Sequence, residues 1–241
     1  MRRRPSCFRA FADRGKGELQ AVLNCPSCGA QVPVRGPSLP YGTCPYCQTL
    51  ILREGLRVED IGKVAVLPYD VSPIQLGTML VADGRGMTVV GRVRWAWSGG
   101  SWNEWLAIAE TGAQFWLAEA AGMFMLTAEW PQLLDQPKVR DFARGEVIAP
   151  GDVVEVEGRK LFAIDIKQVE CLGSEGDLPI PTAIGTRMTS VDFRSASGEV
   201  LSLQRDERGT TAWFGDSWDL LSLKPGNLRE LEGWTMPGDL R

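Results

Sequence analysis

The chain has 241 residues, of which 44% are hydrophobic and 23% charged, and it contains no histidine. This is ordinary composition for a globular protein of one large or several small domains. The lack of histidine excludes Ser-His-Asp triads, Cys-His dyads and metal sites with imidazole ligands. No run of 18 uncharged apolar residues occurs, so we expect no helix to cross a bilayer.

Residues 1–18 are basic and contain no continuous apolar stretch of the kind found in signal peptides. We interpret them as a flexible basic tail and expect a cytoplasmic protein. Residues 1–57 carry nine basic and three acidic side chains, whereas the remainder carries 17 and 27. A basic N-terminal segment followed by an acidic remainder suggests that residues 1–57 contact nucleic acid, through the basic tail, Arg35 and Arg53. The acidic remainder argues against a large phosphate-binding surface, so nucleic acid is not the partner that we expect.

Residues 19–57 are predicted to form a zinc ribbon. Cys25 and Cys28 form one Cys-x-x-Cys motif, Cys44 and Cys47 form a second, and 15 residues separate the two. This spacing is typical of a site in which four thiolates surround Zn²⁺ as a tetrahedron. Such a site leaves no position open for water, so its expected role is to hold a segment too short to build its own core.

Other chemistries fit the same four cysteines. Rubredoxin-type iron also uses paired Cys-x-x-Cys motifs. Two disulfides would form in an oxidising compartment, and a thioredoxin-like redox pair would need a βαβ setting. The two remaining cysteines, Cys7 and Cys171, lack partners at ligand spacing and are interpreted as a tail thiol and a loop or core thiol.

Residues 58–75 contain Pro68 and Pro73 and are predicted to be an extended linker with one short strand at Lys63–Leu67. From residue 76 onward, short alternating runs broken by glycine predict an antiparallel all-β body. The connecting segment 131–149 is expected to form one short helix that begins at Pro131 and is limited by Pro137. Residues 217–241 are expected to be a packed C-terminal tail with a helical turn.

The β body contains an internal repeat. Residues 76–95 align with residues 150–169 at a constant offset of 74, so that Gly77 matches Gly151. The offset grows to about 86–88 further on, because the second copy has a longer loop at residues 171–187. Each copy offers about five strands. The sequence thus predicts a mainly β protein in which the zinc ribbon precedes two tandem small β-barrel-like (SH3-like) repeats, residues 76–130 and 150–216.

Five of the nine tryptophans lie between Trp95 and Trp116, around a turn at residues 98–101. An aromatic hairpin of this kind either packs into the core or presents a stacking surface for a peptide, a base or a cationic amine. The candidate ligand- or partner-binding residues are Trp97, Trp102, Glu104, Trp105 and Asp192.

Glu104 aligns with Asp192 of the second copy. Two carboxylates at equivalent places would bind a cation or act as acid and base if they converged, which the sequence does not show. No histidine, activated nucleophile or phosphate-binding glycine loop accompanies them. We therefore expect a protein that is not an enzyme.

Several short motifs resemble the bacterial domain of unknown function 4178. They cover residues 91–95, 102–106, 115–117 with Gly122, 191–193 and 198–203. The resemblance covers residues 76–216, and family members often carry a Cys-x-x-Cys ribbon in front. It implies no established activity. It does imply an association with bacterial genes for small membrane proteins, phage-shock-like coiled-coil proteins and polyamine-synthesis-like enzymes. This chain has Ser190 where its first copy has Trp102.

The function that we expect from the sequence is a non-enzymatic cytoplasmic adaptor or scaffold that binds a protein partner, with peripheral attachment to a membrane-associated system as one form of it. The first alternative is a sensor of a small molecule or polyamine that uses the aromatic hairpin and the two acids. The second is nucleic-acid binding through the ribbon and basic tail.

Overall fold

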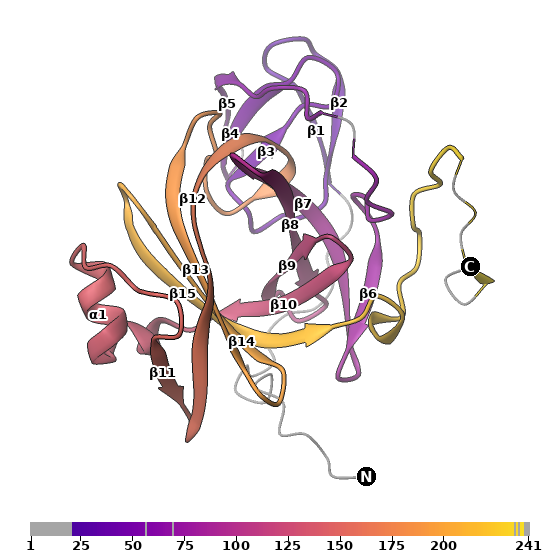
Figure 1. The fold of residues 1–241 in the computed structure, drawn as a ribbon. Helices are drawn as coiled ribbons and strands as arrows, with labels where there is room; N and C mark the ends of the chain where they lie inside the picture. The colour runs from indigo at the N-terminus through magenta and orange to yellow at the C-terminus, as the bar shows by residue number, and fades with distance from the viewer. Residues whose placement is uncertain (1–20, 56, 69, 234, 236, 239–241) are drawn as a thin grey trace.

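The structure is a computed structural model that describes residues 21–55, 57–68, 70–233, 235 and 237–238. The predicted flexible tail lies outside the described residues. The fold is mainly β, as predicted, with a small N-terminal lobe beside a large antiparallel sheet (Figure 1). Within the described part of the chain, no helix is long and apolar enough to cross a bilayer.

The N-terminal lobe has two small antiparallel sheets. Strands β1 (Ala21–Asn24) and β2 (Gln31–Val34) form the first sheet. Strands β3 (Tyr41–Thr43), β4 (Thr49–Glu54) and β5 (Arg57–Lys63) pair in sequence order and form the second, which continues into the large sheet.

The linker prediction is wrong for its first residues, because β5 occupies residues 57–63 and pairs with β4. Pro68 and Pro73 restrict the backbone conformation only of the residues next to them, so they do not predict whether a hairpin precedes them. That hairpin turns at Gly55, whose φ of 61° suits a tight turn. The strand expected at Lys63–Leu67 is likewise absent apart from Lys63 itself, which ends β5.

Eight long strands form a closed antiparallel barrel. The first four make one meander and the last four make a second, and each strand pairs with its successor within its meander. The bounds are β7 (Arg85–Trp97), β8 (Gly100–Ala109), β9 (Gln114–Ala120), β10 (Met123–Glu129), β12 (Arg159–Leu178), β13 (Arg187–Ser195), β14 (Glu199–Asp206) and β15 (Gly209–Trp218).

Two pairings between the meanders close the ring. Strand β7 pairs with β12, and β10 pairs with β15, so neither meander keeps a free edge. The sequence predicts two separate small barrels, but these pairings make the two copies the two halves of one barrel. Their hydrogen-bonding edges satisfy each other, which removes the edges that two independent sheets would expose.

The two halves have matching hydrogen bonds at the offset found in the sequence. Strand β6 (Met79–Ala82) pairs with β7 from Met79↔Thr88 to Ala82↔Arg85, and β11 (Val153–Val156) pairs with β12 in the same register shifted by 74 residues. The amide of Gly77 donates to the Val89 carbonyl at 2.8 Å, and that of Gly151 donates to Ala163 at 2.8 Å.

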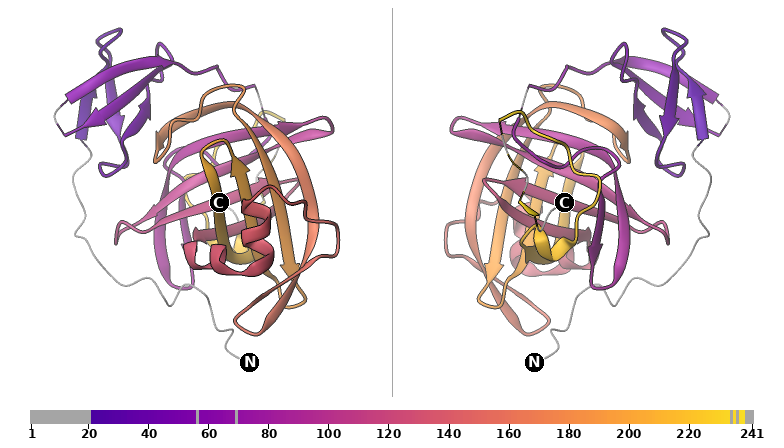
Figure 2. Two further views of the ribbon diagram at one scale, coloured as in Figure 1. Left: turned by 90° about the vertical axis from the view of Figure 1, so that its left-hand side faces the viewer. Right: turned by 90° about the vertical axis from the view of Figure 1, so that its right-hand side faces the viewer.

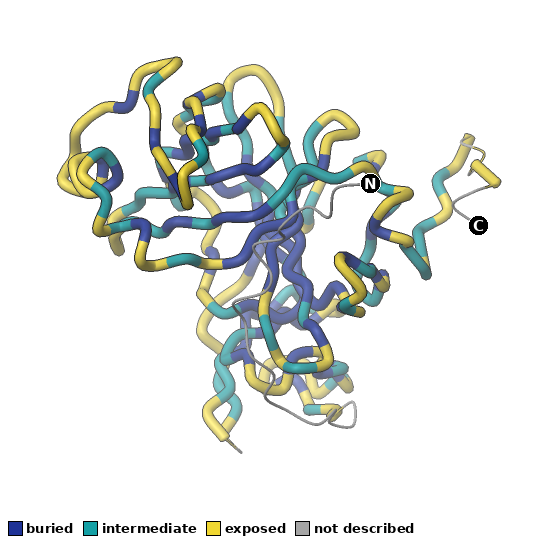
Figure 3. Tube along the Cα trace, turned by 90° about the horizontal axis from the view of Figure 1, so that it is seen from below, coloured by how far each residue is buried: buried dark blue, intermediate teal, exposed yellow. Residues whose placement is uncertain are grey.

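The outer faces of the barrel are apolar and covered. On the first half, β6 and the 3-10 helix η3 (Leu221–Leu223) cover a cluster that includes Trp105. On the second half, β11, the 3-10 helix η2 (Pro131–Asp135) and α1 (Pro137–Ala143) cover a second cluster, and Figure 2 shows α1 against the outside of the barrel. Buried residues gather along the central strands, whereas most loop tips are exposed (Figure 3).

The connecting segment contains two short helices, where one was predicted. Pro137 does not limit the first helix from within but begins the second, at a position where a missing N–H group costs nothing. The C-terminal tail contains the expected helical turn, η3, and a bridge between Met79 and Gly226 holds the next residues against β6.

The backbones approach closely at the strand pairs that close the barrel, so adding a single methyl group there is predicted to destabilise the fold. A Cβ on Gly215 of β15 would lie 1.9 Å from the Leu126 carbonyl oxygen, whereas one on Gly86 of β7 would meet nothing within 4 Å. We expect Gly215→Ala to lower the free energy of unfolding by about 2–4 kcal/mol, and Gly86→Ala to change it by less than about 1 kcal/mol. Urea unfolding followed by circular dichroism measures both, and equal small effects would contradict the proposed closure.

Candidate functional site

The four predicted metal ligands lie together in the N-terminal lobe. The sulfur atoms of Cys25, Cys28, Cys44 and Cys47 are all within 4.8 Å of one another. Each motif is closed by a backbone hydrogen bond, from Gly29 to Cys25 at 2.9 Å and from residue 48 to Cys44 at 3.0 Å. The predicted clustering of the cysteines is confirmed.

The sulfur positions fit a tetrahedral metal ion. The Cys25 and Cys47 sulfurs are 3.7 Å apart, and those of Cys28 and Cys44 are 3.8 Å apart. Four thiolates at about 2.3 Å from one ion would lie about 3.8 Å from each other. The Thr49 hydroxyl lies 3.2 Å from the Cys47 sulfur and is in position to form a hydrogen bond with this predicted metal-ligating atom. These four residues can therefore hold a metal ion.

A buried carboxylate helps to join the cysteine lobe to the barrel. Asp177 of β12 accepts hydrogen bonds from the amides of Arg35 at 2.6 Å and Gly36 at 2.7 Å, and its Oδ1 lies 3.4 Å from Arg53 Nη2. Strand β3 pairs with β12 beside it, and Leu39 is buried in the barrel cluster that contains Trp95. A metal ion that stabilises the lobe therefore also stabilises one end of the barrel.

The second candidate site is the interior of the barrel, a cavity of about 890 Å³ that all eight strands line. Trp97 and Trp102 line it together, with ring centres 5.7 Å apart. Trp105 does not line it, because side chains alternate along β8 and its ring faces the covered outer cluster. There its indole N–H donates to Glu119 at 2.9 Å and the Arg92 guanidinium lies over its ring at 4.6 Å. Of the predicted ligand-binding tryptophans, Trp97 and Trp102 therefore line this cavity and Trp105 does not.

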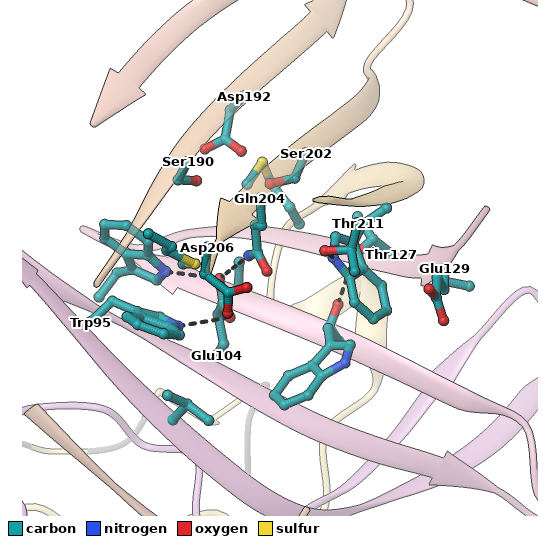
Figure 4. Close-up of a pocket in the computed structure, with 18 of the residues that line it drawn as sticks. Trp95, Glu104, Thr127, Glu129, Ser190, Asp192, Ser202, Gln204, Asp206 and Thr211 are labelled. Atoms are coloured by element: carbon teal, nitrogen blue, oxygen red, sulfur yellow. Dashed lines mark hydrogen bonds between the residues drawn. The ribbon is translucent and has the colours of Figure 1, made fainter. Parts of the chain in front are cut away.

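Glu104 points into the cavity from β8 (Figure 4). Its carboxylate accepts hydrogen bonds from the indole N–H groups of Trp95 at 2.9 Å and Trp102 at 3.2 Å, and from the Gln204 amide at 2.9 Å. Gln204 is on β14, on the other side of the ring, so this last bond crosses the interior. Burial raises the pKa of Glu104 to about 7, although the three donors oppose the shift.

Asp192 points into the same cavity from β13 (Figure 4). Burial raises its pKa to about 6, although a hydrogen bond with Ser202 opposes the shift. Its Oδ1 atom is buried and has no hydrogen-bond partner in the described part of the chain. The Asp192 charge also contributes to the raised pKa of Glu104, so the structure brings the two aligned acids together.

Sequence reasoning missed several side chains that line the cavity. Counting alternate positions outward from Glu104 and Asp192 would have found those on the same strands, but not those on the other strands of the ring. The missed residues most relevant to charge and stacking are Trp95, Trp116, Asp165, Lys167, Arg194, Gln204 and Trp213.

The lining is acidic and aromatic. Five carboxylates and three basic side chains face the cavity, which leaves an excess of two negative charges when all are ionised. Asp206 pairs with Arg208, and Asp165 pairs with Lys167. Neither Glu104 nor Asp192 forms an ion pair with any basic side chain that the structure describes. The two buried acids thus lack a counter-charge of their own.

Metal content gives a direct prediction. The purified chain should carry one metal ion, and Cys44→Ala should lose it and lower Tm, because thiolate binding contributes to the folding of small lobes. Cys171→Ala, at a buried cysteine in the barrel wall, should retain the metal. Elemental analysis by mass spectrometry and thermal unfolding measure both. A metal-free wild-type chain that melts at the same temperature with and without added metal would contradict the site.

The raised pKa of Glu104 predicts a pH dependence of stability. Its ordinary pKa is near 4.5, so between about pH 4.5 and 7 the folded chain holds a proton that the unfolded chain releases. Its contribution to the free energy of unfolding is fully present below pH 4.5 and is lost as the pH rises through 7. Glu104→Gln should flatten this fall relative to the wild type in urea unfolding between pH 4.5 and 8. Parallel curves for the two proteins would show that Glu104 is not desolvated.

The comparisons with known proteins identify the barrel. The family model described as Domain of unknown function (DUF4178) matches residues 75–218, which cover the closed ring from the residues before β6 to the end of β15. No curated protein and no solved structure matches the chain. The resemblance found in the sequence is thereby confirmed, and the chain belongs to the DUF4178 family, with a four-cysteine lobe in front of the family domain.

Proposed function

We propose that the barrel binds a small organic cation, an aliphatic amine, inside its cavity. The observation that carries this proposal is the pair of buried acids, Glu104 and Asp192, neither of which pairs with a basic side chain among the described residues. A buried carboxylate is costly unless a cation or several hydrogen bonds compensate it. Glu104 has its hydrogen bonds, but Asp192 Oδ1 has none. An ammonium group would supply the missing donor and the missing charge together.

The walls of the cavity suit the same ligand. Five tryptophans line it: Trp95, Trp97, Trp102, Trp116 and Trp213. Indole faces attract ammonium groups and also pack against methylene chains. A volume of about 890 Å³ lies within the range of ligand pockets, roughly 300–1,000 Å³. Charge, aromatic surface and size therefore favour an amine over an anionic or a strongly hydrated ligand.

For the cysteine lobe we propose that the metal is zinc with a structural role. Four thiolates complete a tetrahedral sphere, and zinc has no geometric preference that this arrangement would oppose. Iron in the same four-sulfur setting is the other candidate, and the elemental analysis described above distinguishes them.

The other expected roles stay predictions. These are the adaptor role with a protein partner, attachment to a membrane-associated system, a cytoplasmic location and the lack of enzymatic activity. Nucleic-acid binding loses one of its supports, because Arg53 lies against Asp177 with its side chain only 9% exposed and donates to the Leu39 carbonyl at 2.7 Å. Its guanidinium is therefore not available to a phosphate.

Amine binding is tested by titrating the metal-loaded chain with primary alkylamines at pH 8 and constant ionic strength. Calorimetry and tryptophan fluorescence should both report saturable binding, because the indoles line the cavity. Glu104→Gln and Asp192→Asn should each weaken binding at least about tenfold, since a charge-assisted hydrogen bond contributes about 1.5–3 kcal/mol.

Glu110→Gln is the matched control, because Glu110 is an exposed acid outside the cavity lining. It should bind amines as the wild type does. The proposal would be ruled out if the heat and fluorescence changes were no larger than in a titration with sodium chloride. Equal losses of amine affinity in all three variants would also rule it out.

A further inference from the structure

One lysine of the chain already places an ammonium group in the cavity. The Nζ atom of Lys167 lies 4.7 Å from the ring centre of Trp97, and it forms an ion pair with Asp165. All three side chains line the cavity, and the lysine side chain is 22% exposed. An indole face with a carboxylate beside it is the chemistry that recognises an alkylammonium ion. Lys167 therefore marks a place where such an ion fits.

This place adjoins the two buried acids. Asp165 lies directly opposite Asp192 in the β12–β13 pairing, and the charges of Asp165 and Lys167 act on the pKa of Asp192, the first raising it and the second lowering it. Arg194, two residues further along the same strand, donates to the Ser217 hydroxyl at 2.8 Å. Its Nε atom has no partner among the described residues, and the arginine forms no ion pair with Asp192 there. The charge of Lys167 thus acts on Asp192, but Lys167 already pairs with Asp165.

We propose that the ligand is a diamine, with one ammonium group between Glu104 and Asp192 and the other in the place of the Lys167 ammonium, against Trp97 and Asp165. This inference rests on the proposed amine binding and specifies its ligand. With the lysine ammonium displaced, five carboxylates face two basic side chains, and the dication would lower this excess of negative charge from three to one. The displaced lysine side chain is flexible, and its partly exposed position lets it turn toward water.

Affinity for matched pairs of ligands tests the second position. Each linear diamine, from four to ten carbons, is compared with the monoamine of the same carbon number, on the full metal-loaded chain. The best diamine should bind at least about tenfold more tightly than its monoamine, as expected for a second cation–π contact combined with an ion pair. Asp165→Asn should weaken diamine binding by a larger factor than monoamine binding, and so remove most of this advantage. Lys167→Gln should strengthen diamine binding severalfold, because the internal competitor is gone.

The wild-type chain provides a second readout, for which a variant serves only to assign the signal. Reductive ¹³C-methylation of the lysines gives each ammonium an NMR signal, and that of Lys167 should be displaced by the Trp97 ring current. Saturating diamine should move this signal to the position of an exposed lysine, whereas monoamine should leave it in place. The Lys167→Gln chain assigns the signal.

The outcomes separate the two proposals. Equal affinities for monoamines and diamines, or a Lys167 signal that does not move at saturation, would overturn the diamine proposal while amine binding stands. Failure of both ligands to bind would overturn the proposed function itself. A diamine advantage that persists in Asp165→Asn would place the second ammonium group elsewhere and would also overturn the inference.

Discussion

Two edge-to-edge strand pairings, β7 with β12 and β10 with β15, determine what the interior of this protein contains. Each brings two backbones very close, at Gly91 and Gly176 in the first pair and at Gly215 in the second, where an added Cβ would lie 1.9–2.3 Å from a carbonyl oxygen. Because the ring is closed, every second side chain of its eight strands points into one shared cavity. Glu104 and Asp192, which lie in different halves of the sequence, become neighbours for this reason alone.

The distribution of apolar residues explains why that cavity is able to carry charge. The two largest apolar clusters lie on the outer faces, beneath β6 and η3 on one half and beneath β11, η2 and α1 on the other. Burial of these faces supplies the hydrophobic stabilisation that a barrel ordinarily draws from its interior. The interior is thereby free to hold indoles, amides and carboxylates, and their donors and acceptors determine which ligand fits.

The sequence predicts the features that depend on local spacing. Cysteine spacing predicted that the four cysteines lie together, alternation predicted the strands, and alignment of the two copies paired Glu104 with Asp192. The ring closure could not be predicted, because it depends on hydrogen bonds between segments 74–94 residues apart whose edges carry no local signal. Trp105 was assigned to the site from its place in the tryptophan cluster, although alternation puts it on the face opposite Glu104. Lys167 and Trp213 were missed because their only link to Glu104 is the closed ring.

A crystal structure of the metal-loaded chain grown with a linear diamine at pH 8 tests the central claim most directly. The account predicts one ligand nitrogen within hydrogen-bond distance of Asp192 Oδ1, with tryptophan rings against the ligand's methylene groups. A barrel interior that holds only water, or one in which Arg194 turns to pair with Asp192, would contradict it.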